Sequence, residues 1–315
     1  MAGQSTSVVL AALFANGAIA VLKFVGYLLT GSPAMLSETY HSVSDTGNQI
    51  FLLFGIFYGR RERDRQHPFG YGKAQFFYAF LVSVMLFGIA GWESIKNGYE
   101  AIVHGEVHLL HGQVTLLGET FPAVWVNYGV LLGGIAFESY AFLKAYKATK
   151  AEIRERDWSG FVEAFRKTSD VTTLTALIED TVALAGLVLA LVGIYLTQVT
   201  GDPVYDAASA LLIGVLLMGF ALALAWENKR LLIGESVPES AERDLRTIVE
   251  EFDGVAHVDG LRTVYFGPNA VLVTGDVSFD PDLDTAEIDD RISAIEDAIM
   301  EAESDVQKVY IEPEV

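Results

Sequence analysis

The sequence predicts an α-helical membrane protein in which a bundle of six transmembrane helices precedes a smaller C-terminal α+β domain. Hydrophobic residues make up 51% of the 315 residues, and the mean hydropathy is +0.35. That composition is too apolar for an ordinary soluble protein of this length. Residues 1–234 carry 19 acidic and 16 basic side chains, whereas residues 235–315 carry 22 and 5. We therefore predict a nearly neutral transmembrane domain at 1–234 and a strongly acidic cytoplasmic domain at 235–315.

Six segments of the first domain are long enough to cross the hydrocarbon core of a bilayer, which needs roughly 20 helical residues. They are residues 7–30, 33–58, 75–95, 123–143, 172–197 and 203–226. The first segment lacks a basic leader and a small-residue cleavage site, so we expect it to be a retained span and not a signal peptide.

The basic residues between these segments predict the orientation, because Lys and Arg are retained on the cytoplasmic side. The loops after the second and fourth segments and the end of the sixth are basic, whereas the loops after the first, third and fifth contain only Lys96. We therefore expect a multi-pass integral membrane protein with both termini in the cytoplasm. Residues 150–167 follow the fourth segment and fit an amphipathic helix on the cytoplasmic membrane surface or a solvated loop helix equally well.

The acidic domain has the pattern of a small α+β fold. Residues 237–252 and 284–302 show helical apolar spacing, and residues 255–265, 270–279 and 306–311 read as strands. The order αββαβ predicts a small sheet with both helices on one side. A core of about 80 residues is marginal by itself, so dimerisation would stabilise it.

Charge and composition exclude several functions. The formal net charge of −20 excludes nucleic acid as a partner. The chain has no cysteine, which excludes disulfides, iron–sulfur clusters and thiolate zinc sites. Surface acidity on this scale is typical of proteins from a salt-saturated cytoplasm, so we expect the cell membrane of a halophilic microbe. The alternative is that the acids attract cytoplasmic cations toward a transport site.

The second apolar segment carries the strongest chemical signal. Residues 37–49 form a polar run at membrane depth, where ionisable groups are costly and are kept mainly for function. His41 and Asp45 are four residues apart, so a helix stacks them on one face at a spacing that suits two ligands of one divalent cation. Asn48 shares that face. The alternative is a buried polar network that packs helices together.

The fifth segment supplies a second pair of acids, Glu179 and Asp180. Adjacent residues lie about 100° apart around a helix, so only one of them points directly at a site on the second segment. A cation held by His41, Asp45 and Asp180 fits tetrahedral zinc, with water or Glu179 as the fourth ligand. Such a site also accepts cobalt, iron(II) or manganese, and its histidine argues against magnesium or calcium.

Other polar residues in the spans and loops allow more than one role. Glu138, in the fourth segment, fits either proton or metal passage or a bond to a neighbouring helix, and Lys23 is expected to extend toward the membrane interface. An additional metal site is possible in the outer loop if a helix aligns its histidines, which are His104, His108 and His111; the alternative is a solvated amphipathic loop.

With these features the chain resembles the cation diffusion facilitators, which export zinc and related divalent metals from the cytoplasm. The resemblance rests on His41-x-x-x-Asp45, on Asp180 and on the stretch His67-Pro68-Phe69-Gly70-Tyr71-Gly72-Lys73. The sequence around residues 37–49 and 177–186 looks most like the branch that contains the animal zinc transporter nine. The resemblance implies six spans, cytoplasmic termini and a ferredoxin-like C-terminal domain that forms a homodimer. It also implies a metal ligand in that domain at His257, to which Asp276 and Glu312 could contribute; the alternative is a surface histidine near a strand end.

Two departures from the family pattern concern metal ligands. Many members have a histidine four residues before Asp180, where this chain has Ala176, so the fourth ligand is Glu179, Asn48 or water. Some bacterial members bind a second metal in the loop after the second span. Asp64 and His67 match that site, but Tyr71 replaces a histidine, and the alternative is that His67 caps the turn before Pro68.

These features predict a transporter that exchanges a divalent metal, most simply zinc, for protons by alternating access. Metal binding needs a neutral histidine and ionised carboxylates, so protons compete for the same atoms. No covalent step and no cofactor are required, so we expect no enzyme activity. The alternatives are an intramembrane metallohydrolase, for which a His-Glu-x-x-His motif is missing, and a membrane metal sensor.

Overall fold

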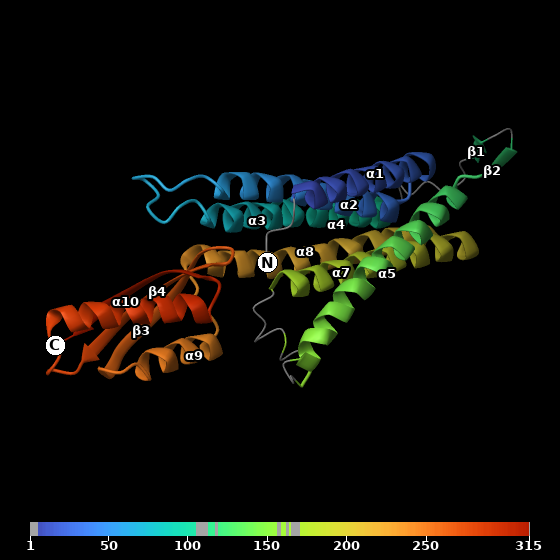
Figure 1. Cartoon of the computed structure of the whole chain (residues 1–315). Helices are drawn as coiled ribbons and strands as arrows, with labels where there is room; N and C mark the ends of the chain where they lie inside the picture. Colours follow the sequence, from blue (N-terminus) through green and yellow to red (C-terminus); the bar gives the residue numbers. More distant parts are fainter. Residues whose placement is uncertain are drawn as a thin grey trace. The chain divides into compact units, whose positions relative to one another are not determined.

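A computed structural model describes residues 6–104, 113–116, 119–155, 159–161, 164 and 171–314 (Figure 1). Contacts within it divide the chain into two compact units, one of residues 1–53 and 79–226 and the other of residues 54–78 and 227–315. The second unit thus contains the acidic C-terminal segment together with the loop that the sequence places after the second span.

The first unit is built from long helices, and each of the six expected segments is helical (Figure 1). The helices are α1 (Thr6–Thr30), α2 (Pro33–Gly59), α3 (Lys73–Met85), η1 (Leu86–Gly91), α4 (Trp92–His104), α5 (Val124–Glu155), α7 (Val171–Thr200) and α8 (Val204–Ile233). The helices α3, η1 and α4 are continuous. The third span is therefore longer than expected, and the fourth likewise continues to Glu155 in α5.

Two connections in this unit use the same turn chemistry. Gly31 and Gly201 have φ of 67° and 73°, the left-handed conformation that ends a helix, and each donates its N–H to a carbonyl of the preceding turn. A proline follows two positions later in both cases, where a missing N–H is tolerated at a helix start. Ser32 caps α2 by accepting the N–H of Met35 at 3.1 Å. The pattern Gly-x-Pro therefore sets sharp reversals between α1 and α2 and between α7 and α8.

Within the described residues, five helical segments are long and apolar enough to cross a membrane. They are Leu13–Thr30, Lys73–His104, Val124–Ala151, Leu177–Thr200 and Val204–Ile233. The remaining helix, α2, has the length of a span with 27 residues, but its polar run lowers its mean hydropathy. The low hydropathy of α2 is the mark of the polar cluster described below.

The π-helical turn η1 in the third span has no counterpart in the sequence analysis. The apolar pattern of the segment predicts an ordinary α-helix, whereas residues 86–91 form a six-residue π-helix. Close packing accompanies it, because a Cβ added at Gly91 would lie 2.6 Å from the Met218 side chain of α8. Helices of this type are rare and occur mostly as single turns inside α-helices.

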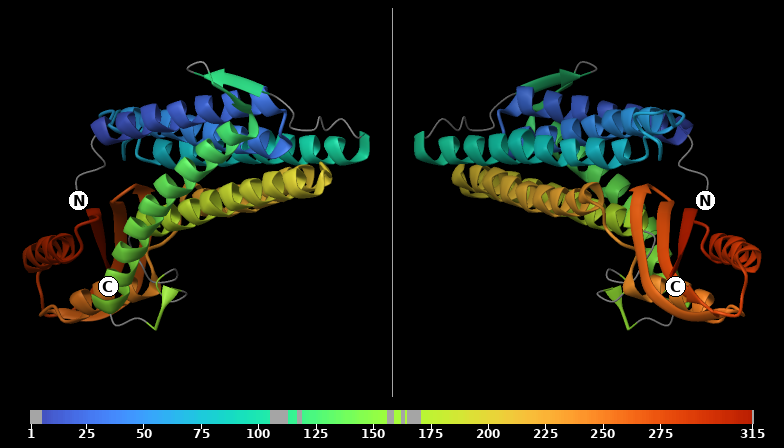
Figure 2. Two further views of the ribbon diagram at one scale, coloured as in Figure 1. Left: turned by 90° about the vertical axis from the view of Figure 1, so that its right-hand side faces the viewer. Right: turned by 90° about the vertical axis from the view of Figure 1, so that its left-hand side faces the viewer.

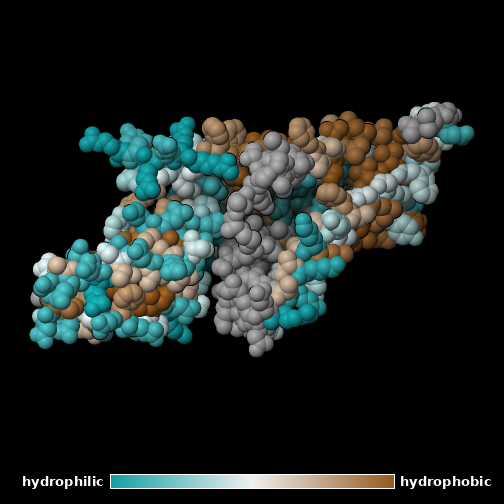
Figure 3. All heavy atoms as spheres, in the orientation of Figure 1, coloured by the Kyte–Doolittle hydropathy of each residue, from teal (hydrophilic) through white to brown (hydrophobic). Residues whose placement is uncertain are grey.

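Apolar side chains fill both the interior and the surface of the first unit. Its core joins residues of α2, η1, α5, α7 and α8, among them Met35, Leu131, Leu187 and Leu217. Large apolar side chains are also exposed along α1, α5, α7 and α8, and the space-filling view shows apolar surface over these helices (Figure 3). In residues 235–314 the exposed large apolar side chains are Met300 and Tyr310. This contrast is expected when lipid covers one part of a chain and water the other.

The C-terminal segment folds as the order αββαβ predicts, which confirms that expectation (Figure 2). Its elements are α9 (Glu239–Glu250), β3 (Val255–Gly267), β4 (Ala270–Phe279), α10 (Thr285–Ala302) and β5 (Val306–Glu314). The strand order is β3-β4-β5, antiparallel between β3 and β4 and parallel between β4 and β5. Alternate residues of β4 are buried with the apolar faces of both helices in one core, so α9 and α10 cover the same face of the sheet.

The outer loop contains a short hairpin of β1 (Gln113–Leu116) and β2 (Glu119–Pro122). The helix α4 ends at His104, while His108 and His111 lie outside the described residues, so the suggested histidine face remains a prediction. Eight of the eighteen positions of the amphipathic segment at 150–167 also lie outside the described residues, and α5 includes its first six positions.

Candidate metal centre

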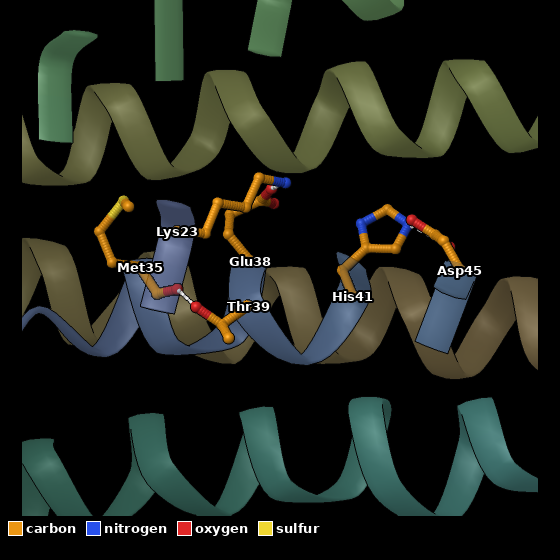
Figure 4. A network of polar contacts seen from close by, with 6 residues as sticks. All are labelled: Lys23, Met35, Glu38, Thr39, His41 and Asp45. Atoms are coloured by element: carbon orange, nitrogen blue, oxygen red, sulfur yellow. Dashed lines mark hydrogen bonds and ion pairs between the residues drawn. The ribbon is translucent and has the colours of Figure 1, made fainter. Parts of the chain in front are cut away.

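Two hydroxyl groups of the polar run on α2 donate to carbonyls of the preceding turn. Thr39 donates to the Met35 carbonyl at 2.8 Å (Figure 4). Thr46 donates to the Ser42 carbonyl, also at 2.8 Å. These bonds to the carbonyl four residues earlier satisfy hydroxyl groups that hydrocarbon would leave unpaired. The helix can therefore carry ionisable side chains into the membrane without losing its own hydrogen bonds.

His41 and Asp45 lie on one face of α2, as their spacing predicts (Figure 4). The His41 Nε2 atom is 3.6 Å from Asp45 Oδ1. The histidine side chain is 3% exposed and the aspartate side chain is 24% exposed. A nitrogen and a carboxylate oxygen thus stand next to each other in a largely enclosed position.

The acids of α7 belong to the same electrostatic neighbourhood. The charge of Glu179 acts on both His41 and Asp45, and the charge of Asp180 acts on Asp45. Glu138 of α5 interacts with Asp45 and Asp180 as well. The helices α5 and α7 therefore contribute acids around the α2 pair, and which of the two α7 acids faces that pair stays a prediction.

Within the described part of the chain, no three His, Asp or Glu side chains converge closely enough to hold a metal ion as they stand. The ligand set His41, Asp45, Asp180 and Glu179 accordingly remains a proposal. Asn48 lines a small cavity with Val82 and Met85, beside α3.

A buried ion pair adjoins the α2 pair and corrects one expectation. Lys23 of α1 does not extend toward the membrane interface. Its ammonium group is 2.7 Å from Glu38 Oε2, and both residues are buried, 5% and 0% exposed. Residue spacing does not predict this contact because the partners lie on different helices, although Glu38 belongs to the polar run and carries the opposite charge.

The loop residues Asp64 and His67 form a compact hydrogen-bonded turn with Tyr71. Asp64 Oδ1 accepts the backbone N–H groups of Gln66 and His67, both at 2.8 Å, and Oδ2 accepts the Tyr71 hydroxyl at 2.6 Å. The tyrosine hydroxyl and then the backbone N–H of His67 hold the pKa of Asp64 below its usual value. Both oxygens are occupied and the aspartate caps the turn, which favours a structural role over the loop metal site.

The tail histidine has no comparable surroundings. His257 is exposed on β3, and Asp276 Oδ2 on β4 accepts a hydrogen bond from Arg262 at 2.7 Å. Glu312 is the register partner of Asp276 on β5. The arginine already neutralises the aspartate, so these described residues offer little support for a tail metal site.

Comparisons with known proteins agree with this architecture. A model of the cation efflux transmembrane domain matches residues 9–233, and a model of the cytoplasmic domain of cation efflux proteins matches residues 237–314. The human proton-coupled zinc antiporter SLC30A9, mitochondrial, is 30% identical over 274 residues, which cover 87% of this chain and 46% of that protein. Metal tolerance protein C4 of Arabidopsis thaliana is 26% identical over 287 residues, which cover 88% of this chain and 57% of the relative.

A shorter match is the magnetosome protein MamM of Paramagnetospirillum magneticum, which is 36% identical over 81 residues, a quarter of each chain. This chain spans about half the length of the human and plant relatives. The two models together cover nearly all of its residues, with the transmembrane model alone covering more than half. The chain therefore belongs to the cation efflux family, the cation diffusion facilitators.

Proposed function

We propose that this protein exports a divalent metal, zinc first, in exchange for protons by alternating access. One observation carries the proposal: His41 and Asp45 stand together inside a membrane helix, within electrostatic reach of the acids of α7. Family membership supports metal efflux, and the name of the human relative supports zinc and proton coupling.

The ligand chemistry supports zinc over the abundant hard cations. The proposed ligands are His41, Asp45, Asp180 and Glu179, one imidazole and three carboxylates. Zinc accepts such a mixed set in tetrahedral geometry, and cobalt, iron(II) and manganese are the competing substrates. Magnesium and calcium prefer oxygen ligands alone. The metal is cargo here, so no resident cofactor is proposed.

Proton exchange follows from the same atoms. Metal binding requires a neutral imidazole at His41 and ionised carboxylates at Asp45 and on α7. Protons compete with the metal for these groups, so a site that opens to a more acidic compartment releases the metal and takes up protons. The residues only bind and release ions, which makes this a transporter and not an enzyme.

The proposal includes assembly and orientation. The cytoplasmic-domain model that matches residues 237–314 is named for dimerisation, which supports a homodimer joined through this domain. The basic loops support cytoplasmic termini. The acidity of residues 235–315 supports a cell membrane facing a salt-rich cytoplasm.

Zinc transport into sealed proteoliposomes tests the proposal. We expect the parent protein to accumulate zinc when the vesicle interior is more acidic than the outside, because protons leave in exchange for zinc. We expect Asp45→Asn to abolish uptake because it removes an anionic ligand with little change in shape. The control is Asp206→Asn, another buried acid, whose Oδ1 accepts bonds from Ser32 and Ala34 that asparagine can keep. Metal binding without transport by the parent would instead support a sensor, and unimpaired uptake by Asp45→Asn would refute the site.

A further inference from the structure

The pair of Lys23 and Glu38 is an unusual feature of the membrane unit. It joins α1 to α2 through a 2.7 Å contact between Nζ and Oε2 (Figure 4). A buried ion pair contributes little net stability, because desolvation of the two charges offsets their attraction. Packing α1 against α2 therefore does not require these charges, and their placement calls for another explanation.

The second oxygen of Glu38 has no partner. Glu38 Oε1 is fully buried and accepts no hydrogen bond from the described residues. A buried carboxylate oxygen without a donor is costly, so it calls for an explanation, such as a functional role or a bound ion or water. A cation or a donor that arrives from elsewhere would satisfy it.

The unpartnered oxygen faces α7 at a glycine. A Cβ added at Gly186 would lie 2.5 Å from Glu38 Oε1 and 4.0 Å from His41 Nδ1. Side chains of Glu38 and His41 both point from α2 toward this helix (Figure 4). Because glycine lacks a side chain, the Glu38 carboxylate can pack directly against α7 at this point, with the His41 imidazole beside it.

The ion pair also acts electrostatically on the candidate metal centre. Of the charges that act on His41, those of Glu38 and Lys23 are the strongest, and the same two lead for Asp45. The pair is therefore an electrostatic part of the centre, although neither residue belongs to the proposed ligand set.

We propose that Glu38 is a second station for the divalent cation, and that Lys23 is a tethered ammonium that competes with the metal for it. This inference rests on the proposed metal transport. The metal would pass from His41 and Asp45 to the unpartnered Oε1 beside Gly186, while Lys23 retains Oε2. Because the ammonium cancels the charge of Glu38, the metal binds there weakly and can leave.

Metal affinity and transport rate of the full-length protein test this inference together. Cobalt(II) titration, followed by visible absorption, reports affinity, and zinc uptake into proteoliposomes reports rate. We expect Lys23→Met to bind cobalt at least tenfold more tightly and to transport more slowly, because Glu38 is freed to hold the metal. Affinity at or below that of the parent overturns the proposal.

The neutral double variant Lys23→Met/Glu38→Gln covers the case in which Lys23→Met does not fold. It leaves no unpaired buried charge. If the pair were only structural, this variant would transport at the parent rate, and that result overturns the proposal. We expect at least a tenfold loss of rate with cobalt affinity within threefold of the parent, because the ligands at His41 and Asp45 remain.

A third variant changes the packing at Gly186 without changing any charge. Gly186→Ala places a methyl group against Glu38 Oε1, and we expect at least a tenfold loss of transport rate. The matched control is Gly133→Ala on α5, where an added Cβ meets no atom within 4 Å. Equal rates for the two variants would count against the second station. A parent protein that moves no zinc would refute the proposed function as well, whereas parent transport with insensitive variants refutes only this inference.

Discussion

At the scale of single residues, the two acids of α7 are neighbours in sequence but differ in their surroundings. The charge of Glu179 interacts with those of both His41 and Asp45. Helical phase alone does not decide which α7 acid is a metal ligand, because the spacing leaves either one free to face α2. The proposed ligand set therefore includes both.

We expect Glu179→Gln and Asp180→Asn each to weaken zinc binding by more than tenfold, because each removes an anionic ligand that its amide replaces poorly. Zinc competition against a chelating dye, on purified protein at neutral pH, measures both affinities. Asp206→Asn is the control for the loss of a buried acid. If Glu179→Gln binds zinc like the parent, water fills the fourth position and Asp180 is the sole α7 ligand.

The loop aspartate offers a second residue-scale test. The Tyr71 hydroxyl is the main cause of the lowered pKa of Asp64. We expect Tyr71→Phe to raise that pKa toward its ordinary value, as measured by carboxyl carbon NMR titration of the full-length protein. Tyr58→Phe is the control, because Tyr58 contacts the Tyr71 ring but gives Asp64 no hydrogen bond. An unchanged pKa in Tyr71→Phe would contradict the assigned cause.

The sign of the linked pH effect follows from the direction of the shift. The folded-state pKa of Asp64 lies below its unfolded value, so its contribution to loop stability is present above the unfolded pKa. That contribution is lost as the pH falls through the folded pKa. Acid should therefore loosen residues 64–71, and hydrogen exchange in this loop is expected to rise earlier in Tyr71→Phe.

At the scale of elements, two glycines bring the loop before α3 against the turn between β3 and β4 within the second unit. A Cβ added at Gly72 would lie 2.7 Å from the Phe266 carbonyl oxygen and 2.8 Å from the Gly267 Cα atom. Rings of Phe69 and Phe266 stand 6.1 Å apart at the same contact. The close backbone approach leaves no room for a side chain.

We expect Gly72→Ala to loosen this contact, because an added methyl group against backbone costs about 1–3 kcal/mol. Hydrogen exchange followed by mass spectrometry measures it, with faster exchange expected at residues 266–270. Gly88→Ala in η1 is the control, since its added Cβ meets no atom within 4 Å. Unchanged exchange in Gly72→Ala would mean that the loop and the turn do not hold each other.

At the scale of the whole molecule, the acidic domain and the membrane helices have separate functions in the proposed mechanism, dimerisation and metal binding. The ligands lie on α2 and α7, while residues 235–315 carry the sheet and the helices α9 and α10. Deleting 235–315 should therefore weaken dimerisation more than it weakens metal binding. Mass photometry in detergent measures the dimer fraction, and zinc competition measures affinity. Dimers that persist at micromolar concentration after the deletion would contradict the assignment.

The spacing of residues along the chain determined most helices and strands of this protein and one pair of its candidate site. Helical apolar runs, the Gly-x-Pro reversals and the αββαβ order all depend on residues a few positions apart, so each could be predicted before any contact was known. The same holds for His41 and Asp45, because one helical turn separates them regardless of what packs around α2.

Only the tertiary structure decided which distant groups meet. Lys23 pairs with Glu38 and not with the interface, since the packing of α1 against α2 brings them to 2.7 Å. The π-helical turn, the close approach of Glu38 to Gly186 and the surroundings of Glu179 likewise depend on neighbouring helices. In a membrane interior an ionisable group must be paired or enclosed, and a sequence states its charge but not the partner that packing brings within reach.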